Sequence, residues 1–174
     1  MKFYKKIIFI LPILVLTSQN LLADLPKYLD FNYVLNESTA GSKAQKSLKN
    51  MFQKTMNELN DKEKNLLNEE KELIKKKRII SEEEYKNKIK ELRKKVIDLR
   101  KLKNESLSDL TKKRTNARNT LLKNLNPILK QYMQDKQIRM VIDKKDLILA
   151  DEKLDITDDI IKILNDKLKS IKLN

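Results

Sequence analysis

The sequence has no cysteine, no histidine and no tryptophan, and its 174 residues include a single glycine, Gly41. Without Cys or His the chain cannot build a zinc finger, a haem or iron–sulfur site, a thiol nucleophile or a His-dependent catalytic triad. One glycine is too few for the loops that hold nucleotide phosphates. Asp158 and Asp159 are adjacent, and adjacent helical residues do not face each other, so their carboxylates cannot act together as a catalytic pair. Acidic residues in the first turn of a helix, where the helix dipole favours them, are the better explanation. We therefore expect no enzymatic activity, no catalytic residues, no metal and no cofactor.

Charge is what the chain has in abundance. Lys and Arg number 39 against 25 Asp and Glu, a formal net charge of +14, and charged residues make up 37% of the chain. A composition this rich in Lys, Glu, Leu and Asn, and this poor in Gly, is typical of long helices rather than of a compact mixed domain.

Residues 1–23 have the layout of a secretory signal peptide. Three lysines precede an apolar run of ten residues, 7–16, which is too short to span a bilayer. A polar stretch follows, and we place cleavage after Ala23. A short uncleaved anchor is the alternative interpretation. The absence of cysteine excludes a lipoprotein anchor and means that the exported chain gains no stability from disulfides.

Two long amphipathic helices are predicted, over residues 42–80 and 81–125. Ser42 suits an N-cap of the first helix. Ser81 and Glu84 have the S-x-x-E form of a capping box that starts the second, so the chain reverses near 77–82. The apolar residues follow heptad spacing at Leu48, Phe52, Met56, Leu59, Leu66 and Leu73, and then at Tyr85, Ile89, Leu92, Val96, Leu99, Leu110, Ala117, Leu121 and Leu125.

The two helices predict a protruding antiparallel hairpin. At about 1.5 Å per residue, the first helix alone would be about 55–60 Å long. Charged residues such as Glu63, Glu70 and Arg114 interrupt the seam, which indicates weak packing and a flexible hairpin. The periodicity alone also fits an ordinary coiled-coil spacer.

The end of the second helix has two interpretations. Asn126 could cap a shorter helix that begins at Pro127, because Pro is favoured at the first helical position. Pro127 could equally lie at a kink in one continuous helix.

Three short strands are predicted in the flanking segments. Residues 28–35 mix aromatic and β-branched residues and lead into a turn. Residues 138–142 and 147–150 are predicted to form a hairpin around a turn at 143–146. Thr157 is expected to cap a final helix.

The predicted fold class is mainly α with a small β body. The helical hairpin arm spans 42–125, and a β-rich trimerisation body with a C-terminal helix is built from 24–41 and 126–174. A body this small is marginal alone and its strands have open edges, so we expect the subunits of a homo-oligomer to complete one another.

The charge is concentrated on the arm. Residues 71–95 hold eleven Lys and Arg and five acids, whereas residues 135–166 hold six Lys and Arg and nine acids. A basic arm attracts acidic partners, among them an acidic polypeptide or an anionic membrane surface. Only Phe52 and Tyr85 supply aromatic rings on the arm, so nucleic-acid binding is not supported. A solvated face that keeps a long helix soluble is the simpler interpretation of any single Lys.

Three stretches carry a resemblance to a known family. They are LDFNYVLNESTAG at 29–41 with Ala44 and Gln45, MVID at 140–143 with 147–150 after it, and LDITDDIIK at 154–162. In these stretches and in their order the chain resembles the Skp/OmpH family of periplasmic chaperones, over residues 28–165.

The resemblance implies a homotrimer. In that family nine strands form a barrel-like body, three helical hairpins surround a cavity, and unfolded outer-membrane proteins are held without nucleotide. It implies the same role for this chain: an ATP-independent holdase in the periplasm, whose partners are unfolded outer-membrane β-barrel proteins. A structural coiled-coil protein of the cell envelope is the alternative.

Two groups of residues are the candidates for these roles. The body core or trimer contacts are predicted at Phe31, Val34, Met140, Val141, Ile142, Leu147 and Leu149. Client contact is predicted at Phe52, Met56, Tyr85 and Leu92, with Lys75, Lys76, Lys77 and Arg78 near the tip.

Overall fold

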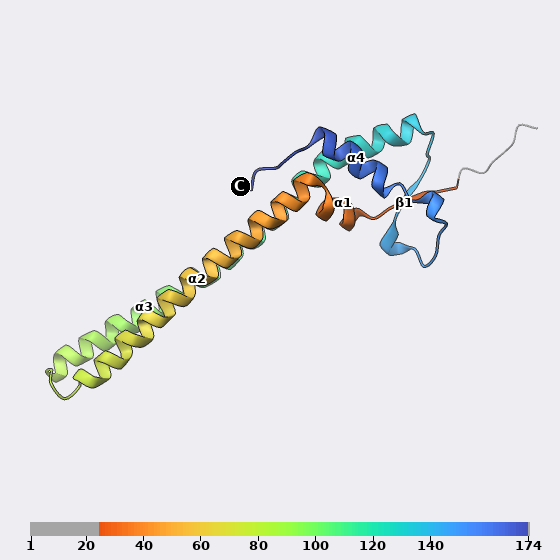
Figure 1. Cartoon of the computed structure of the whole chain (residues 1–174). Coiled ribbons are helices and arrows are strands. Elements are labelled where there is room, and N and C mark those ends of the chain that lie inside the picture. Colours follow the sequence, from red (N-terminus) through yellow and green to blue (C-terminus); the bar gives the residue numbers. More distant parts are fainter. Residues whose placement is uncertain (1–24, 174) are drawn as a thin grey trace, which may run out of the picture.

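The computed structural model describes residues 25–173 as a long helical arm joined to a small body (Figure 1). Its elements are, in order, β1 (Lys27–Leu29), α1 (Phe31–Glu37), α2 (Thr39–Lys76), α3 (Glu82–Asp135), β2 (Val141–Asp143), the 3-10 turns η1 (Lys144–Asp146) and η2 (Glu152–Leu154), and α4 (Thr157–Lys167). The predicted signal peptide lies outside the described residues. Within the described range, no helix has both the length and the apolar character needed to cross a membrane. The fold is mainly helical with one small sheet.

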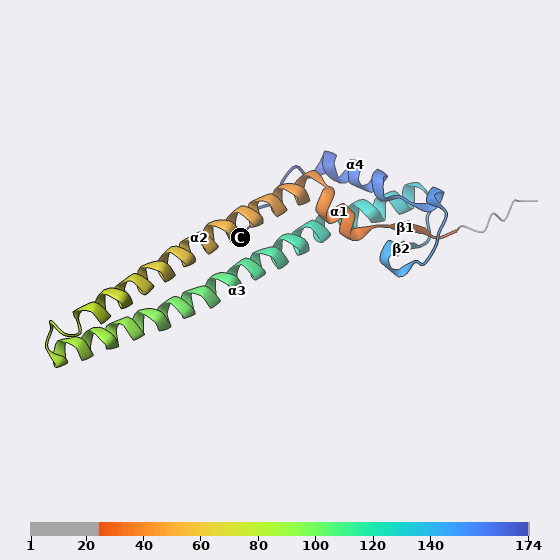
Figure 2. The same ribbon diagram turned by 60° about the horizontal axis from the view of Figure 1, so that its bottom comes forward.

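The arm is the antiparallel pair α2 and α3, which lie side by side from the body to the tip (Figure 2). Leu59 and Leu73 of α2 are buried, at positions that the heptad spacing predicted. The chain reverses at the tip, where the Ser81 hydroxyl accepts a hydrogen bond of 3.1 Å from the Glu84 N–H at the start of α3. The predicted helical hairpin and its capping serine are confirmed.

The first arm helix begins at Thr39, so the prediction that Ser42 caps it is wrong. Ser38 is the N-cap: its buried hydroxyl accepts a hydrogen bond of 3.2 Å from the Gly41 N–H. Ser42 already donates its own N–H to the Ser38 carbonyl, as a residue inside a helix does. The free donors that need a cap lie at the corner between α1 and α2, and Ser38 occupies that corner.

The second arm helix is one continuous helix that passes through Pro127 and enters the body. Of the two interpretations of Asn126 and Pro127, the continuous helix is therefore the one that holds. Pro127 has no N–H to donate to the preceding turn. The helix continues despite this missing hydrogen bond because the neighbouring residues Leu121, Leu125 and Ile128 pack into the core of the body.

The sheet of the body has two short parallel strands, β1 and β2. Lys27, Tyr28 and Leu29 pair with Val141, Ile142 and Asp143 in that order. Tyr28 also forms an isolated bridge with Asp155, and its carbonyl accepts a hydrogen bond of 3.0 Å from the Ile156 N–H. The first strand thus contacts both β2 and the segment at Asp155 and Ile156 that leads into α4.

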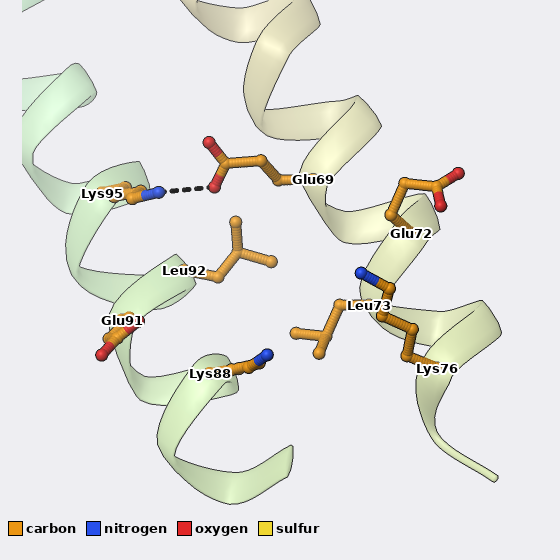
Figure 3. A pocket seen from close by; sticks show the side chains of 8 residues that line it. All are labelled: Glu69, Glu72, Leu73, Lys76, Lys88, Glu91, Leu92 and Lys95. Carbon is orange, nitrogen blue, oxygen red and sulfur yellow. Dashed lines mark hydrogen bonds and ion pairs between the residues drawn. The ribbon is translucent and has the colours of Figure 1, made fainter. Parts of the chain in front are cut away.

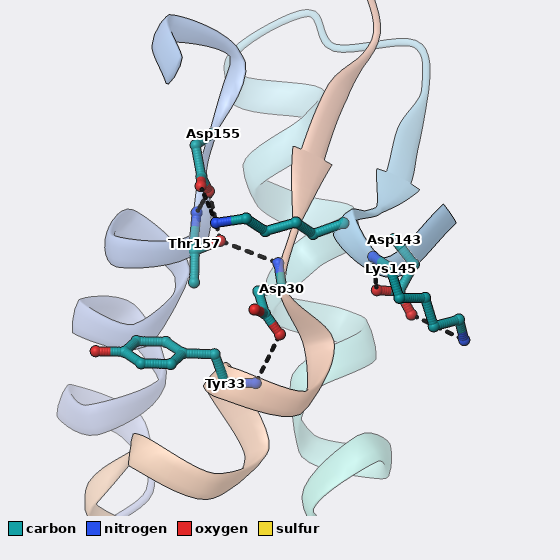
Figure 4. A network of polar contacts seen from close by, with 7 residues as sticks. Asp30, Tyr33, Asp143, Lys145, Asp155 and Thr157 are labelled. Atoms are coloured by element: carbon teal, nitrogen blue, oxygen red, sulfur yellow. Dashed lines mark hydrogen bonds and ion pairs between the residues drawn. The ribbon is translucent and has the colours of Figure 1, made fainter. Parts of the chain in front are cut away.

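The predicted hairpin over 138–150 is wrong. Its first strand lies at Val141–Asp143, shifted toward the C-terminus, and residues 147–150 form no strand. The cause is visible after β2. The Asp143 carboxylate accepts a hydrogen bond from the Lys145 N–H and starts the turn η1, and the chain that leaves η1 finds no partner strand among the described residues (Figure 4).

The predicted strand over 28–35 is correct only at its start. Asp30 ends β1 and caps α1, because its carboxylate accepts a hydrogen bond of 2.8 Å from the Tyr33 N–H (Figure 4). α1 then buries Val34 and Leu35 on one side. The β-favouring residues of this segment are overridden by a local cap and by burial against the core.

Helix α4 covers the body and completes its core. Thr157 is its first residue rather than its cap, which corrects the prediction. The Asp155 carboxylate accepts hydrogen bonds from both the N–H and the hydroxyl of Thr157, and the Thr157 hydroxyl oxygen accepts a bond of 3.0 Å from the Asp30 N–H (Figure 4). The buried cluster is formed by Leu29, Val34, Leu35, Ala40, Leu121, Leu125, Ile128, Ile156, Ile160 and Leu164.

Candidate functional site

The arm offers an extended surface rather than an enclosed site. Along its length the side chains of α2 and α3 leave shallow grooves, and the described residues hold no cluster of acidic side chains placed to bind a metal ion. The surface divides into two sides, because the seam between the helices places different residues on its two flanks.

One flank of the seam carries ion pairs. The Lys95 ammonium of α3 donates to the Glu69 carboxylate of α2 at 2.6 Å, while Leu73 and Leu92 point toward each other between the helices (Figure 3). Lys76 and Lys88 line the same groove, which has a volume of about 260 Å³. We call this flank the ion-paired face. On α2 its residues Lys62, Glu69 and Lys76 each lie three positions after the seam leucines Leu59, Leu66 and Leu73.

The opposite flank carries apolar side chains. Residues three before or one after a seam position lie on the other side of the helix from those three after it. On α2, Met56 lies three before Leu59, and Leu67 and Ile74 directly follow the seam leucines Leu66 and Leu73. On α3, Ile89 and Val96 lie three before the seam leucines Leu92 and Leu99. We call these five residues the apolar face. Leu67, Ile74 and Val96 are 50%, 59% and 44% exposed, and Met56 and Ile89 are half-buried.

The charged residues along the apolar face are unpaired within the described chain, unlike Glu69 and Lys95 on the ion-paired face. Arg100 of α3 lies one turn after Val96 and Lys103 one turn further, and Glu63 and Glu70 of α2 lie one turn before and one turn after Leu67. None of these four charged groups takes part in an ion pair within residues 25–173. The face therefore combines exposed apolar area with charges that remain available to a ligand.

The tip is basic and also exposes an isoleucine. Lys75 and Lys76 end α2, Lys77 and Arg78 follow in the turn, and Ile79 is largely exposed. Lys75 donates a hydrogen bond of 2.7 Å to Glu72, and this bond, with the lysine charge, lowers the pKa of the Glu72 carboxyl. Lys76, Lys77 and Arg78 form none of the ion pairs found in the described chain, so they remain available to an acidic partner.

The structure brings some of the predicted contact residues together and separates others. The Lys77 ammonium lies 5.8 Å from the centre of the Tyr85 ring at the tip. Phe52 is about half exposed and lies one turn before Met56, in the middle of the arm. Leu92 is half-buried and faces Leu73, so it packs the helices together (Figure 3).

Sequence reasoning missed most of the apolar face. It named Met56 as a contact residue. It read Leu67 and Ile74, which directly follow the seam leucines Leu66 and Leu73, only as a widening of the seam stripe, and it assigned Ile89 and Val96 to the seam itself. The available signal was the apolar residue that directly follows Leu66 and again Leu73, seven positions later, which widens the stripe on the same side of the helix both times.

The predicted body contacts fall into three groups. Val34 is fully buried in the core of its own chain, with Phe31 and Val141 packed against that core. Ile142 and Leu147 are half-buried. Met140 and Leu149 are exposed, and so is Ile148, which sequence reasoning did not name. Met140 directly precedes β2, and Ile148 and Leu149 lie in the loop that follows η1.

Comparison with known proteins agrees with this architecture. The sequence profile of the family described as "Outer membrane protein (OmpH-like)" matches residues 27–164, from β1 into α4. This chain belongs to the OmpH-like family. The search of curated proteins found no match.

A solved structure shares the OmpH-like fold of this chain. It is a protein of Caulobacter crescentus described as a candidate outer membrane chaperone, OmpH-like. The superposition has a TM-score of 0.79 at 22% sequence identity, and it covers 86% of this chain and 90% of the other. At this identity the likeness establishes the fold, including the arm and the body.

Proposed function

We propose that this protein is an ATP-independent holdase chaperone of the periplasm, which binds unfolded outer-membrane β-barrel proteins and prevents their aggregation. Membership of the OmpH-like family supports this proposal, and so does the chaperone description of the Caulobacter crescentus relative in fold. The observation that carries it is the apolar face of the arm, where Leu67, Ile74 and Val96 remain exposed beside unpaired charges.

The chemistry of the apolar face fits such clients. The strand segments of outer-membrane barrel proteins alternate apolar and polar residues, and in the unfolded chain these segments aggregate readily in water. Each exposed side chain on the arm offers a small apolar contact, and Met56 adds an unbranched side chain that adapts to different shapes. Many weak contacts hold a client without fixing its conformation, so release needs no nucleotide.

We propose further that three chains assemble through their bodies and that the three arms surround a cavity. Met140, Ile148 and Leu149 support this arrangement, since they expose apolar area on the body next to a sheet of only two short strands. Open edges of this kind are usually paired or covered. In such a trimer the apolar faces would turn toward the cavity and the ion-paired faces toward solvent.

The test uses the chain from Asp24 onward without nucleotide. A urea-unfolded outer-membrane barrel protein is diluted into buffer with increasing amounts of the chain, and light scattering is recorded. We expect scattering to be suppressed near three chains per client. No suppression by a folded helical protein would reject the holdase function and favour a structural coiled-coil protein of the envelope.

A matched pair of variants tests the assignment of the faces. The first carries Leu67→Ser, Ile74→Ser and Val96→Ser on the apolar face. The control carries Met51→Ser, Ile97→Ser and Leu102→Ser, which are also exposed apolar arm residues but lie off that face. We expect the first variant to need about tenfold more protein for the same suppression, in keeping with the loss of apolar contact area, and the control to behave like the parent. Equal losses in the two variants would refute the assignment.

A further inference from the structure

The C-terminal segment 165–173 contacts the base of the arm, and we call it the strap. It begins directly after the residues matched by the family profile, which end at Leu164. The last turn of α4 belongs to it, and the rest runs past the start of α2 (Figures 1 and 2). Leu168 and Ile171 of the strap are partly buried against the core of the body.

The strap satisfies a donor at the start of α2. The first N–H groups of a helix have no partner within it and need an external acceptor. Ser38 serves Gly41, and the side-chain oxygen of Asn165 accepts a hydrogen bond of 2.6 Å from the partly buried N–H of Thr39. One turn further, the Lys43 ammonium donates a bond of 3.2 Å to the Lys169 carbonyl. Two successive turns of α2 are thus tied to the strap.

These bonds connect α2 to α4 and the strap, and α4 in turn contacts α3, so both arm helices are joined to α4 at the root of the arm. α4 packs on α3, and the Tyr132 hydroxyl at the end of α3 donates a bond of 2.7 Å to Asp159. α3 continues into the body as one helix, whereas α2 begins at the corner at Ser38 and contributes only its first turns, with Ala40 in the core. A two-helix arm bends most easily when one helix slides along the other, a motion of the shear type. Fixing the start of α2 to α4 opposes that sliding.

We infer that the strap is a clamp that stiffens the root of the arm and so limits how far the arm swings. In the proposed holdase, and only if that function holds, the strap would set the range of client sizes that the arms can enclose. The mechanical part of the inference concerns the protein without client and can be tested by itself.

The test measures amide hydrogen exchange in residues 36–48 in four variants. Asn165→Ala removes the acceptor of the Thr39 N–H, and a chain that stops at Leu168 removes the Lys169 carbonyl and Ile171. Asn165→Asp keeps an acceptor oxygen and should behave like the parent. We expect exchange at the start of α2 to be about fivefold faster or more in the first two, as for loss of one ordinary hydrogen bond. The exposed Asp166→Ala is the matched control and should not change it.

Arm motion gives the second readout. The chain contains no cysteine, so donor and acceptor dyes can be placed at Arg78→Cys on the tip and Glu152→Cys on the body, in chains diluted with unlabelled protein. We expect a broader distance distribution in the Asn165→Ala and truncated chains. Unchanged exchange and unchanged distances would overturn the strap, whether or not the protein suppresses client aggregation. Loosened arms in a protein that suppresses no aggregation would support the strap and reject the holdase.

Discussion

The Tyr132 hydroxyl donates a hydrogen bond of 2.7 Å to the Asp159 carboxylate and joins the last turns of α3 to the first turn of α4. Burial of the ring and the bond to Asp159 raise the pKa of Tyr132 to about 12. The bond also positions the helix from which the strap continues. This bond therefore adds a polar contact to the buried packing that already joins α3 to α4.

Replacing Tyr132 by Phe should lower the free energy of unfolding by about 1 kcal/mol at pH 8, the usual contribution of such a bond. The folded pKa lies above the ordinary value of 10, so the contribution is fully present below pH 10 and is lost between about pH 10 and pH 12. Urea unfolding at a fixed protein concentration, at pH 8 and near pH 11.5, checks this. The difference between the parent and Tyr132→Phe should shrink at the higher pH. Tyr33→Phe, at an exposed ring, is the control, and a difference that stays constant with pH would contradict the prediction.

Gly41 lies at the tight corner between α1 and α2. A Cβ atom at this position would be 1.8 Å from the Leu35 carbonyl oxygen, which is backbone and cannot turn aside. Gly41→Ala should therefore shift one helix against the other and cost about 2–3 kcal/mol, as overpacking of a core does. Thermal unfolding followed by circular dichroism measures the effect. Ser42→Ala, one residue along and exposed, should be nearly neutral, and similar melting of the two variants would show that the corner adapts freely.

The sequence allowed the arm to be predicted because its determinants are local. Heptad spacing placed Leu59 and Leu73 at the seam, and the Ser81–Glu84 pair marked the start of α3. The body was predicted less well because its determinants are contacts between distant segments. The parallel pairing of β1 with β2 joins residues more than 100 positions apart, and no local turn motif predicts it.

Two errors in the body have specific physical causes. Residues 31–35 have β-favouring side chains, but the Asp30 cap and the burial of Val34 and Leu35 make the segment helical. Residues 147–150 look like a strand, yet Leu149 is 92% exposed because nothing in the described chain pairs with it. Among the contact residues, Leu67, Ile74, Ile89 and Val96 were not assigned to client contact because the sequence alone does not tell which flank of a seam carries ion pairs.

Leu149 should be needed for assembly but not for folding of the chain. Because it is exposed, Leu149→Asp buries no new charge within one chain, and helicity should be retained. In a trimer whose subunits contact one another there, the buried unpaired carboxylate would prevent association. Sedimentation velocity measures the oligomeric state, with Ile97→Asp on the exposed side of the arm as the control. A Leu149→Asp trimer as stable as the parent would place the interface elsewhere.

The basic tip should govern how fast acidic clients are captured. Changing Lys75, Lys76, Lys77 and Arg78 to Gln removes four positive charges at the end of the arm. Because attraction between exposed charges raises association rates and is screened by salt, we expect capture to slow about tenfold at low ionic strength and to change little at 0.5 M salt. Stopped-flow fluorescence of a labelled, unfolded client measures the rate. The matched control changes Lys46, Lys49, Lys64 and Lys71, which are exposed along α2 and form none of the ion pairs found in the described chain, to Gln. If the control slows capture as much as the tip variant does, total charge rather than the tip attracts the client.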